Sequence, residues 1–179
     1  LAVPPEVDDP VAQSGWIKFG EPRFPMPGGE PLRFVQPRVG RLVLWRMAIK
    51  PGRPVAMGII GGTPFIGLPG NPVASFVTFV HVVRPTILAL SGAMQEKLLP
   101  MPVRAGFTYR KKIARREYVR VSLRRAADGA LEAEKFPREG AGLLSSLVDT
   151  DGLVELGEDV TLVEPGQMVG FLSYASLIS

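Results

Sequence analysis

Residues 65–80, FIGLPGNPVASFVTFV, contain the strongest indication of the fold class. An apolar run ends at Pro69-Gly70-Asn71-Pro72 and resumes with the spacing of a buried helix. Asn71 is a favoured N-cap, because its side-chain oxygen can accept a free backbone N–H, and Pro72 suits the first helical position. The stretch therefore predicts a strand, a tight bend and a buried helix.

The start of this helix is also a candidate anion site. Free N–H groups and the positive end of the helix dipole attract an anion there. Open α/β sheets bind their ligands where a strand gives way to a helix. A capped, buried helix with no ligand accounts for the same residues, so the motif alone leaves both interpretations open.

A second motif, WRMAIKPGRP, occupies residues 45–54. Lys50 and Arg53 flank a rigid Pro-Gly turn, so little entropy need be lost when an anion binds. Arg46 lies near the end of the preceding strand. An arginine can form paired hydrogen bonds to an oxyanion, whereas a lysine acts as a compact point charge. A surface turn with solvated charges is the alternative interpretation.

Composition narrows the class of protein. The chain has 179 residues, 46% of them hydrophobic, which is enough for one domain or two small ones. It has no cysteine and one histidine, His81, which excludes a disulfide framework and a zinc site built on Cys and His. We expect His81 to be packed rather than catalytic. The absence of cysteine fits a reducing compartment, so we expect a cytoplasmic protein.

Two further features bear on partners. The longest uncharged apolar run, Val73–Val83, is about half of the roughly 20 residues that a membrane span needs, so we expect no membrane partner. The formal net charge is +4, which favours anionic partners without choosing among them.

The chain divides into three parts. Residues 1–38 hold eight prolines and four glycines and predict a loop-rich lead-in. Residues 39–95 predict an α/β segment, and residues 100–179 predict an all-β domain. Within them we expect strands at 40–49, 55–60, 63–68, 117–123, 152–156, 160–164 and 168–172, with a hairpin at Asp128-Gly129.

Basic residues are concentrated in the third part. Nine cations lie between Arg104 and Arg125, with aromatic residues among them. Such a surface could bind single-stranded nucleic acid, and a solvated charged face is the other interpretation. Alternation in EYVRVSL indicates a half-buried strand. One face would carry Val119, Val121 and Leu123, and the other Tyr118, Arg120 and Ser122.

Together these motifs carry a family resemblance. LWRMAIKPGRPVAMG followed by FIGLPGNPVASFVTFVHVVRPTILALSG resembles the end of the third domain of the molybdopterin molybdenumtransferases, bacterial relatives of the gephyrin E domain. RKKIARREYVRVSL, GAGLLSSLVDTDGLVEL and VEPGQMVGFL resemble that family's small C-terminal β-barrel domain. The resemblance covers residues 39–178. It implies an α/β fragment, the end of a molybdopterin-binding domain, followed by a small β-barrel.

The resemblance also implies an activity in molybdenum cofactor biosynthesis. Enzymes of this family insert molybdate into adenylylated molybdopterin and release AMP, with Mg²⁺ as cofactor. The acidic and glycine-rich motifs of the family are not supplied by residues 1–38, so we expect the Mg²⁺ ligands to lie outside this chain and the chain alone to be inactive. A homodimer is expected. A nucleic-acid-binding barrel and a partner-docking scaffold are the alternative functions.

Site residues follow from the resemblance position by position. The catalytic candidates are Lys50, Pro69 and Pro72. The substrate-binding candidates are Arg46, which stands where lysine is commoner, with Arg53, Gly70, Asn71, Arg115, Ser145 and Ser146.

Overall fold

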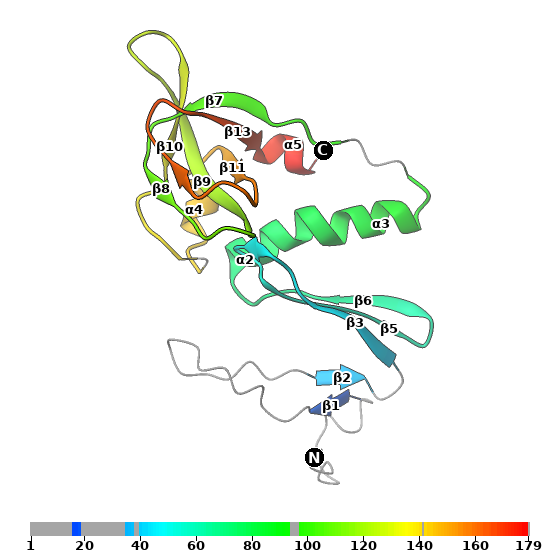
Figure 1. Ribbon diagram of the computed structural model, residues 1–179. Helices are drawn as coiled ribbons and strands as arrows, with labels where there is room; N and C mark the ends of the chain where they lie inside the picture. The colour runs from blue at the N-terminus through cyan, green and yellow to red at the C-terminus, as the bar shows by residue number, and fades with distance from the viewer. Residues whose placement is uncertain (1–15, 19–34, 38–39, 94–96, 141, 179) are drawn as a thin grey trace. The chain divides into compact units, whose positions relative to one another are not determined.

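The computed structural model describes residues 16–18, 35–37, 40–93, 97–140 and 142–178 (Figure 1). Most of the predicted lead-in lies outside these residues. The chain forms two compact units, one of residues 1–45 with 56–67 and the other of residues 46–55 with 68–179. Helix and barrel thus share a unit. The predicted division of the chain into residues 1–38, 39–95 and 100–179 stays a prediction. The two compact units reflect which residues contact one another and do not by themselves test domain boundaries.

The first unit contains two small sheets. Strands β1 (Trp16–Lys18) and β2 (Val35–Pro37) pair antiparallel. Strands β3 (Gly40–Arg46), β5 (Pro54–Ile60) and β6 (Thr63–Gly67) form a three-stranded sheet in the order β3-β5-β6. The hairpin between β5 and β6 confirms two of the expected strands.

The strand expected at residues 40–49 is in fact two strands in different sheets. Strand β3 ends at Arg46, and β4 (Ile49–Lys50) pairs with the barrel instead. Met47 and Ala48 separate the two strands, and the Met47 N–H donates to the Arg53 carbonyl at 3.1 Å. Burial of Ile49 in the second unit then favours the separate pairing.

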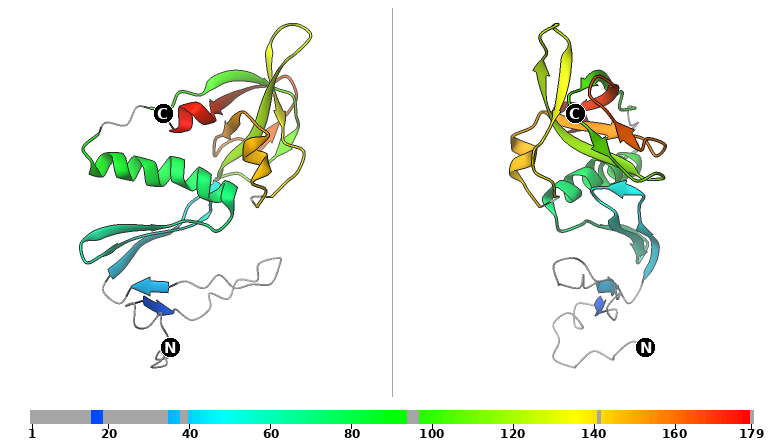
Figure 2. Two further views of the ribbon diagram at one scale, coloured as in Figure 1. Left: turned by 180° about the vertical axis from the view of Figure 1, so that it is seen from behind. Right: turned by 60° about the vertical axis from the view of Figure 1, so that its left-hand side comes forward.

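The second unit contains a closed five-stranded barrel (Figures 1 and 2), as the predicted fold class requires. The sheet order is β10-β7-β13-β11-β9, and β9 pairs with β10 to close it. Strands β7 and β10 run parallel, and the other barrel neighbours run antiparallel. The barrel strands are β7 (Met101–Ala105), β9 (Arg116–Arg125), β10 (Leu131–Lys135), β11 (Gly152–Leu156) and β13 (Met168–Ser173).

Shorter elements complete this unit. Strands β8 (Tyr109–Arg110) and β12 (Leu162–Val163) pair with each other. Two short helices, α4 (Ser145–Val148) and α5 (Tyr174–Ile178), follow β10 and β13 along the chain. The hairpin expected at Asp128-Gly129 is confirmed, with the Ala126 N–H donating to the Ala130 carbonyl at 2.9 Å.

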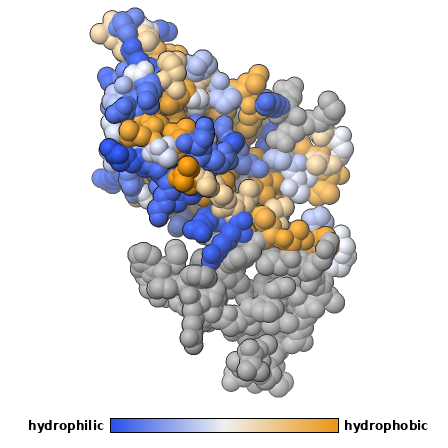
Figure 3. All heavy atoms as spheres, viewed as in Figure 1, coloured by the Kyte–Doolittle hydropathy of each residue, from blue (hydrophilic) through white to orange (hydrophobic). Residues whose placement is uncertain are grey.

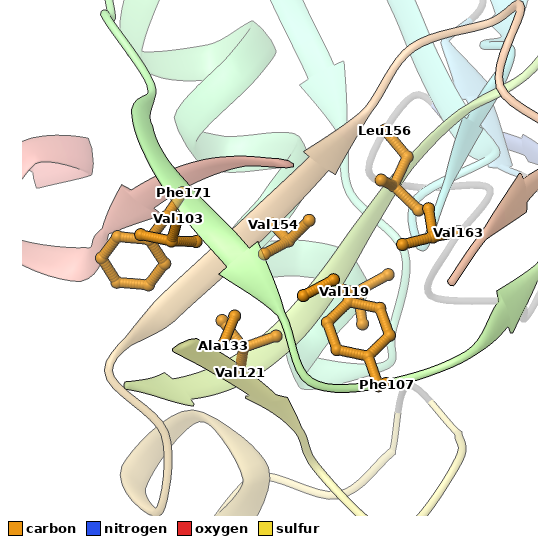
Figure 4. Close-up of a cluster of buried hydrophobic side chains, with 10 residues drawn as sticks. Val103, Phe107, Val119, Val121, Ala133, Val154, Leu156, Val163 and Phe171 are labelled. Carbon is orange, nitrogen blue, oxygen red and sulfur yellow. The ribbon is translucent and has the colours of Figure 1, made fainter. Parts of the chain in front are cut away.

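Apolar side chains from all five strands fill the barrel (Figure 4). The alternation in β9 points Val119 and Val121 inward, as expected, and Leu123 packs at the edge of the cluster. Val103, Ala133, Val154 and Phe171 contribute from the other four strands. The period of two along each strand therefore defines the core.

The other face of β9 is not the solvent face that alternation predicted. Tyr118 is buried in a second cluster with Leu153 and Leu172 from the neighbouring strands. Val77 and Val80 of the long helix complete that cluster, so the helix covers the outer side of these barrel strands. A sequence period cannot reveal such a cover, because it comes from a distant segment.

The long helix begins at Pro72, as predicted, and continues to Leu90 as α2 (Pro72–Thr78), the π-helical turn η1 (Phe79–Val83) and α3 (Arg84–Leu90). Pro85 lies just after the π-turn. Proline lacks an N–H to donate and crowds the preceding turn, and a wider π-turn accommodates both effects.

The expected Asn71 cap is only half right. Asn71 occupies the N-cap position with extended backbone, φ −78° and ψ 128°, but its side chain makes no capping hydrogen bond. Instead the Ser75 hydroxyl donates to the Pro69 carbonyl, and the Ser75 N–H bonds the Asn71 carbonyl at 2.8 Å. The bend is therefore stabilised by hydrogen bonds from Ser75, a residue of the helix itself.

By length and composition alone, this 19-residue helix could cross a membrane. The expectation that its apolar run is too short for a span is therefore wrong, because the helix continues through Arg84 and Pro85. A core helix of a soluble protein meets the same criteria. Packing of Val77 and Val80 against the barrel favours that second interpretation.

We predict that Gly52→Ala lowers the free energy of unfolding by about 2–4 kcal/mol. Gly52 has φ +115°, and a Cβ there would lie 2.6 Å from the fully buried Thr78 Oγ1. Urea unfolding followed by circular dichroism measures the loss. Gly129→Ala is the matched control, since Gly129 has φ +81° with open space around it. Equal losses in the two variants would contradict a close contact at Gly52.

We also predict that His81 makes stability depend on pH. Burial lowers the His81 pKa from 6.5; the charge of Glu155 acts to raise it, and the charge of Arg116 lowers it further. The Nε2 atom is buried without a hydrogen-bond partner among the described residues, and the ring stacks on Tyr118 with centroids 4.3 Å apart. The folded state thus favours neutral imidazole. Its contribution is present above pH 6.5 and is lost as pH falls below that value.

His81→Phe should keep the stacked ring and remove the titration. The free energy of unfolding of the variant should therefore fall less than that of the wild type between pH 7 and pH 5. Chemical unfolding at several pH values makes the comparison. Identical slopes for the two proteins would rule out His81 as the source.

Candidate functional site

Strand β4 is short, but it determines where Lys50 lies. It pairs parallel with the start of β9, with Ile49 opposite Arg116 and Lys50 opposite Glu117. The Arg116 N–H also donates to the Ala48 carbonyl at 2.8 Å. This register brings a lysine from the Pro-Gly turn beside a carboxylate of the barrel.

Glu117 is the centre of a charged cluster, although its side chain is only 1% exposed. Oε2 accepts a hydrogen bond from the Tyr109 hydroxyl at 2.7 Å and lies 3.4 Å from Lys50 Nζ. Oε1 accepts from Arg115 Nε at 2.9 Å and from Arg115 Nη2. Lys50 Nζ in turn donates to the Tyr109 hydroxyl at 3.1 Å. We call these four residues the Glu117 cluster.

The protonation states follow from these contacts. Burial acts to raise the pKa of Glu117, but hydrogen bonds from Tyr109 and Arg115 and the charge of Lys50 outweigh it, so the pKa is lowered. Burial acts to lower the pKa of Lys50, and Tyr109 and Glu117 reverse the direction. Burial and the hydrogen bond to Glu117 raise the pKa of Tyr109. At neutral pH the cluster therefore holds two cations, one carboxylate and a neutral phenol.

The cluster leaves cationic surface available for a ligand. Lys50 is half exposed and Arg115 one quarter exposed, whereas Glu117 is enclosed. A buried carboxylate needs charged or hydrogen-bonding partners, so the enclosed Glu117 side chain favours keeping Lys50 and Arg115 beside it. The Glu117 cluster has a net charge of +1, and its solvent-accessible charge lies on the two cations.

The remaining cations of the Pro-Gly turn lie at the surface. Arg46 and Arg53 are both exposed. The Arg53 carbonyl accepts the N–H groups of Met47 and Val55, which fixes the backbone of the turn. Gly52 brings the turn against α2, close to Ala74 and Thr78. The turn that carries Lys50 thus packs beside the first turns of the long helix.

The bend before α2 is accessible. Gly70 and Asn71 are exposed, and Pro69 and Pro72 are partly buried. Because the Asn71 side chain does not cap the helix, it leaves the first-turn N–H groups to other acceptors. These features match what an oxyanion needs at a helix start.

A third segment approaches the same bend. A Cβ placed on Gly142 would lie 3.9 Å from Asn71 Oδ1, so the segment before α4 lies beside the helix start. Arg120 Nη1 holds this segment by donating to the Gly140 carbonyl at 2.9 Å and to Ser146 Oγ at 2.7 Å. The barrel therefore contributes to the surroundings of the bend.

The two candidate serines differ in exposure. Ser145 is exposed, whereas Ser146 is fully buried and its hydroxyl donates to the Leu143 carbonyl. In this structure Ser146 shapes the segment, and Ser145 is the hydroxyl open to a ligand.

Sequence reasoning missed Glu117 and the role of Tyr109. A signal for Glu117 was available, because the alternation in EYVRVSL puts residue 117 on the same face as Val119 and Val121. A carboxylate on a buried face requires charged or hydrogen-bonding partners. No comparable pattern links Tyr109 to Lys50, which lies 59 residues away.

Among the described residues, no group of three or more His, Cys, Asp or Glu side chains could hold a metal ion. We therefore assign no ligand in this part of the chain to the Mg²⁺ that the resemblance implies.

Comparison with known proteins places the chain in a family. Residues 102–174 match the MoeA C-terminal region (domain IV). The chain is 32% identical over 162 residues to the molybdopterin molybdenumtransferase of Haemophilus influenzae. The aligned region covers 90% of this chain and 38% of that protein. It thus spans well under half the length of that relative.

Solved structures agree with this match. The molybdopterin biosynthesis MoeA protein of Pyrococcus horikoshii superposes with a TM-score of 0.59 at 27% identity, covering 75% of this chain and 32% of that one. A molybdenum cofactor biosynthesis protein of Pyrococcus furiosus gives a TM-score of 0.57 at 28% identity, covering 74% and 45%. Since sequence and fold agree, the chain belongs to the MoeA family of molybdopterin molybdenumtransferases, and it matches the C-terminal part of those proteins.

Proposed function

We propose that this chain forms part of an enzyme that inserts molybdate into adenylylated molybdopterin. In that reaction water cleaves the phosphoanhydride bond, AMP leaves, and molybdenum is retained on the dithiolene of the pterin. Both substrates are anions, so the protein must supply positive charge and hydrogen-bond donors. The Glu117 cluster is the observation that carries the proposal, because it holds Lys50 and Arg115 as outward-facing cations.

The roles of the residues follow from their chemistry. Lys50 stabilises negative charge on phosphate or molybdate oxygens as a point charge, and Arg115 contributes paired N–H donors. Gly70 and Asn71 present backbone at the start of α2, where an anion is favoured. Such a site accelerates the reaction by electrostatic stabilisation and needs no protein nucleophile.

The paired charges of the barrel argue against the nucleic-acid alternative. Arg104 bonds Asp128 at 2.7 Å, and Arg116 bonds Glu155 at 2.7 Å. Arg124 lies 2.5 Å from Glu132. Figure 3 shows hydrophilic residues over much of the barrel surface, and these ion pairs join basic residues of the barrel to acidic ones. A groove that binds single-stranded nucleic acid needs a row of cations available to the phosphates. In these ion pairs the cations are already partnered by carboxylates. No observation favours a docking scaffold.

We predict that Lys50→Gln lowers the rate of AMP release by about 100-fold, since the variant keeps a polar side chain, one atom shorter, but loses its charge. Relatives extend well beyond the residues of this chain, so the assay uses a full-length protein that contains it. The substrates are adenylylated molybdopterin and molybdate, and AMP is measured by chromatography.

Two variants sharpen the result. Lys97→Gln removes an exposed lysine outside the Glu117 cluster and should leave the rate unchanged. Lys50→Arg keeps the charge and should retain more activity than Lys50→Gln. Wild-type turnover in Lys50→Gln would remove Lys50 from the proposed site.

The proposal includes a homodimer in the cytoplasm with Mg²⁺ as cofactor, held by residues beyond those described here. We expect the mass of the full-length protein by light scattering to equal two subunits. A single-subunit mass at micromolar concentration would contradict the dimer. We expect removal of Mg²⁺ by a chelator to stop AMP release without unfolding the barrel, because the described barrel residues provide no metal centre.

A further inference from the structure

We propose that Glu117 is a positioning residue that holds Lys50 and Arg115 together as one oxyanion-binding pair. This inference rests on the proposed function, because it assigns how the cations of that same site are held. Glu117 itself would not touch the ligand, since its side chain is 1% exposed.

The geometry supports a positioning role for two reasons. First, the two carboxylate oxygens divide their partners: Oε1 accepts from Arg115, and Oε2 lies near Lys50 and accepts from Tyr109. Second, the two cations come from different segments: Lys50 lies in β4, and Arg115 directly precedes β9. Among the described contacts, Glu117 joins both cations through one rigid group.

Tyr109 strengthens the link to Lys50. Its hydroxyl donates to Glu117 and accepts from Lys50 Nζ, so it fixes the direction of the ammonium group. The Lys50 ammonium also lies 5.6 Å from the centroid of the Tyr109 ring. A flexible lysine is thereby restricted before a ligand arrives, which reduces the ordering entropy that binding must overcome.

A purely electrostatic role and a positioning role of Glu117 predict opposite changes in anion affinity when Glu117 is replaced, so an experiment can distinguish them. If Glu117 only adds negative charge beside an anion site, its removal should strengthen anion binding. If it positions the cations, its removal should weaken binding although the charge change is favourable. The sign of the change in affinity decides between the two.

The experiment titrates sodium molybdate into the full 179-residue chain at low ionic strength by isothermal calorimetry. Glu117→Gln keeps the shape of the side chain and removes its charge. We expect it to weaken molybdate binding by about tenfold, the scale set by ordering two long side chains. Glu117→Asp keeps the charge and should restore part of the affinity, which a purely space-filling role does not explain.

Matched variants make the result specific. Glu134→Gln removes an exposed carboxylate that pairs with Arg124 in β9 and should not change the affinity. If Glu117→Gln does not fold, Tyr109→Phe replaces it: the variant keeps the ring, loses the bridging hydroxyl and should weaken binding about threefold. Circular dichroism verifies the fold of each variant.

The outcomes separate this inference from the proposed function. Unchanged or tighter molybdate binding in Glu117→Gln, or unchanged binding in Tyr109→Phe, overturns the positioning role. If Lys50→Gln still loses molybdate binding in that case, the proposed site itself stands. Wild-type affinity in Lys50→Gln, or no molybdate binding by the wild type, overturns the proposed site and the positioning role with it.

Discussion

The parallel pairing of β4 with β9 is the constraint on which the candidate site depends. Only two residues of β4 take part, yet their register sets Lys50 opposite Glu117. A slip of one residue would turn Lys50 to the other face of the strand and place another side chain beside the carboxylate. The buried position of Ile49 opposes such a slip, because a slip would expose its side chain.

Electrostatics in the barrel follow from how its charges are distributed. Arg104, Arg116 and Arg124 of the basic stretch pair with glutamate or aspartate on a neighbouring strand or turn, so their charge is neutralised locally. The Glu117 cluster differs, because two cations share one carboxylate. Its positive charge lies on side chains that are partly or half exposed, whereas its negative charge is enclosed. The net basicity of the chain is thus less informative than this local imbalance.

The long helix supports the barrel, and its start is part of the candidate site. It covers the outer face of β9, β11 and β13 through Val77 of α2 and Val80 of η1, so these strands are covered on both faces there. The α2 portion receives the Pro-Gly turn at Gly52. The helix start, the turn and the barrel are therefore held in one unit by apolar packing, with the charged groups at its surface.

Local chemistry was predictable from the sequence. Pro72 at the first helical position, the hairpin at Asp128-Gly129 and the inward face of β9 each depend on residues a few positions apart, so short patterns determine them. The tertiary structure alone decided that Tyr118 is covered by a helix and that the strand expected at 40–49 divides between two sheets. It also decided that Lys50, Tyr109, Arg115 and Glu117 form one cluster. The physical reason is that the contacts of Lys50 and of the long helix with the barrel join segments far apart in the chain, and their energies depend on strand register and burial, which no local pattern encodes.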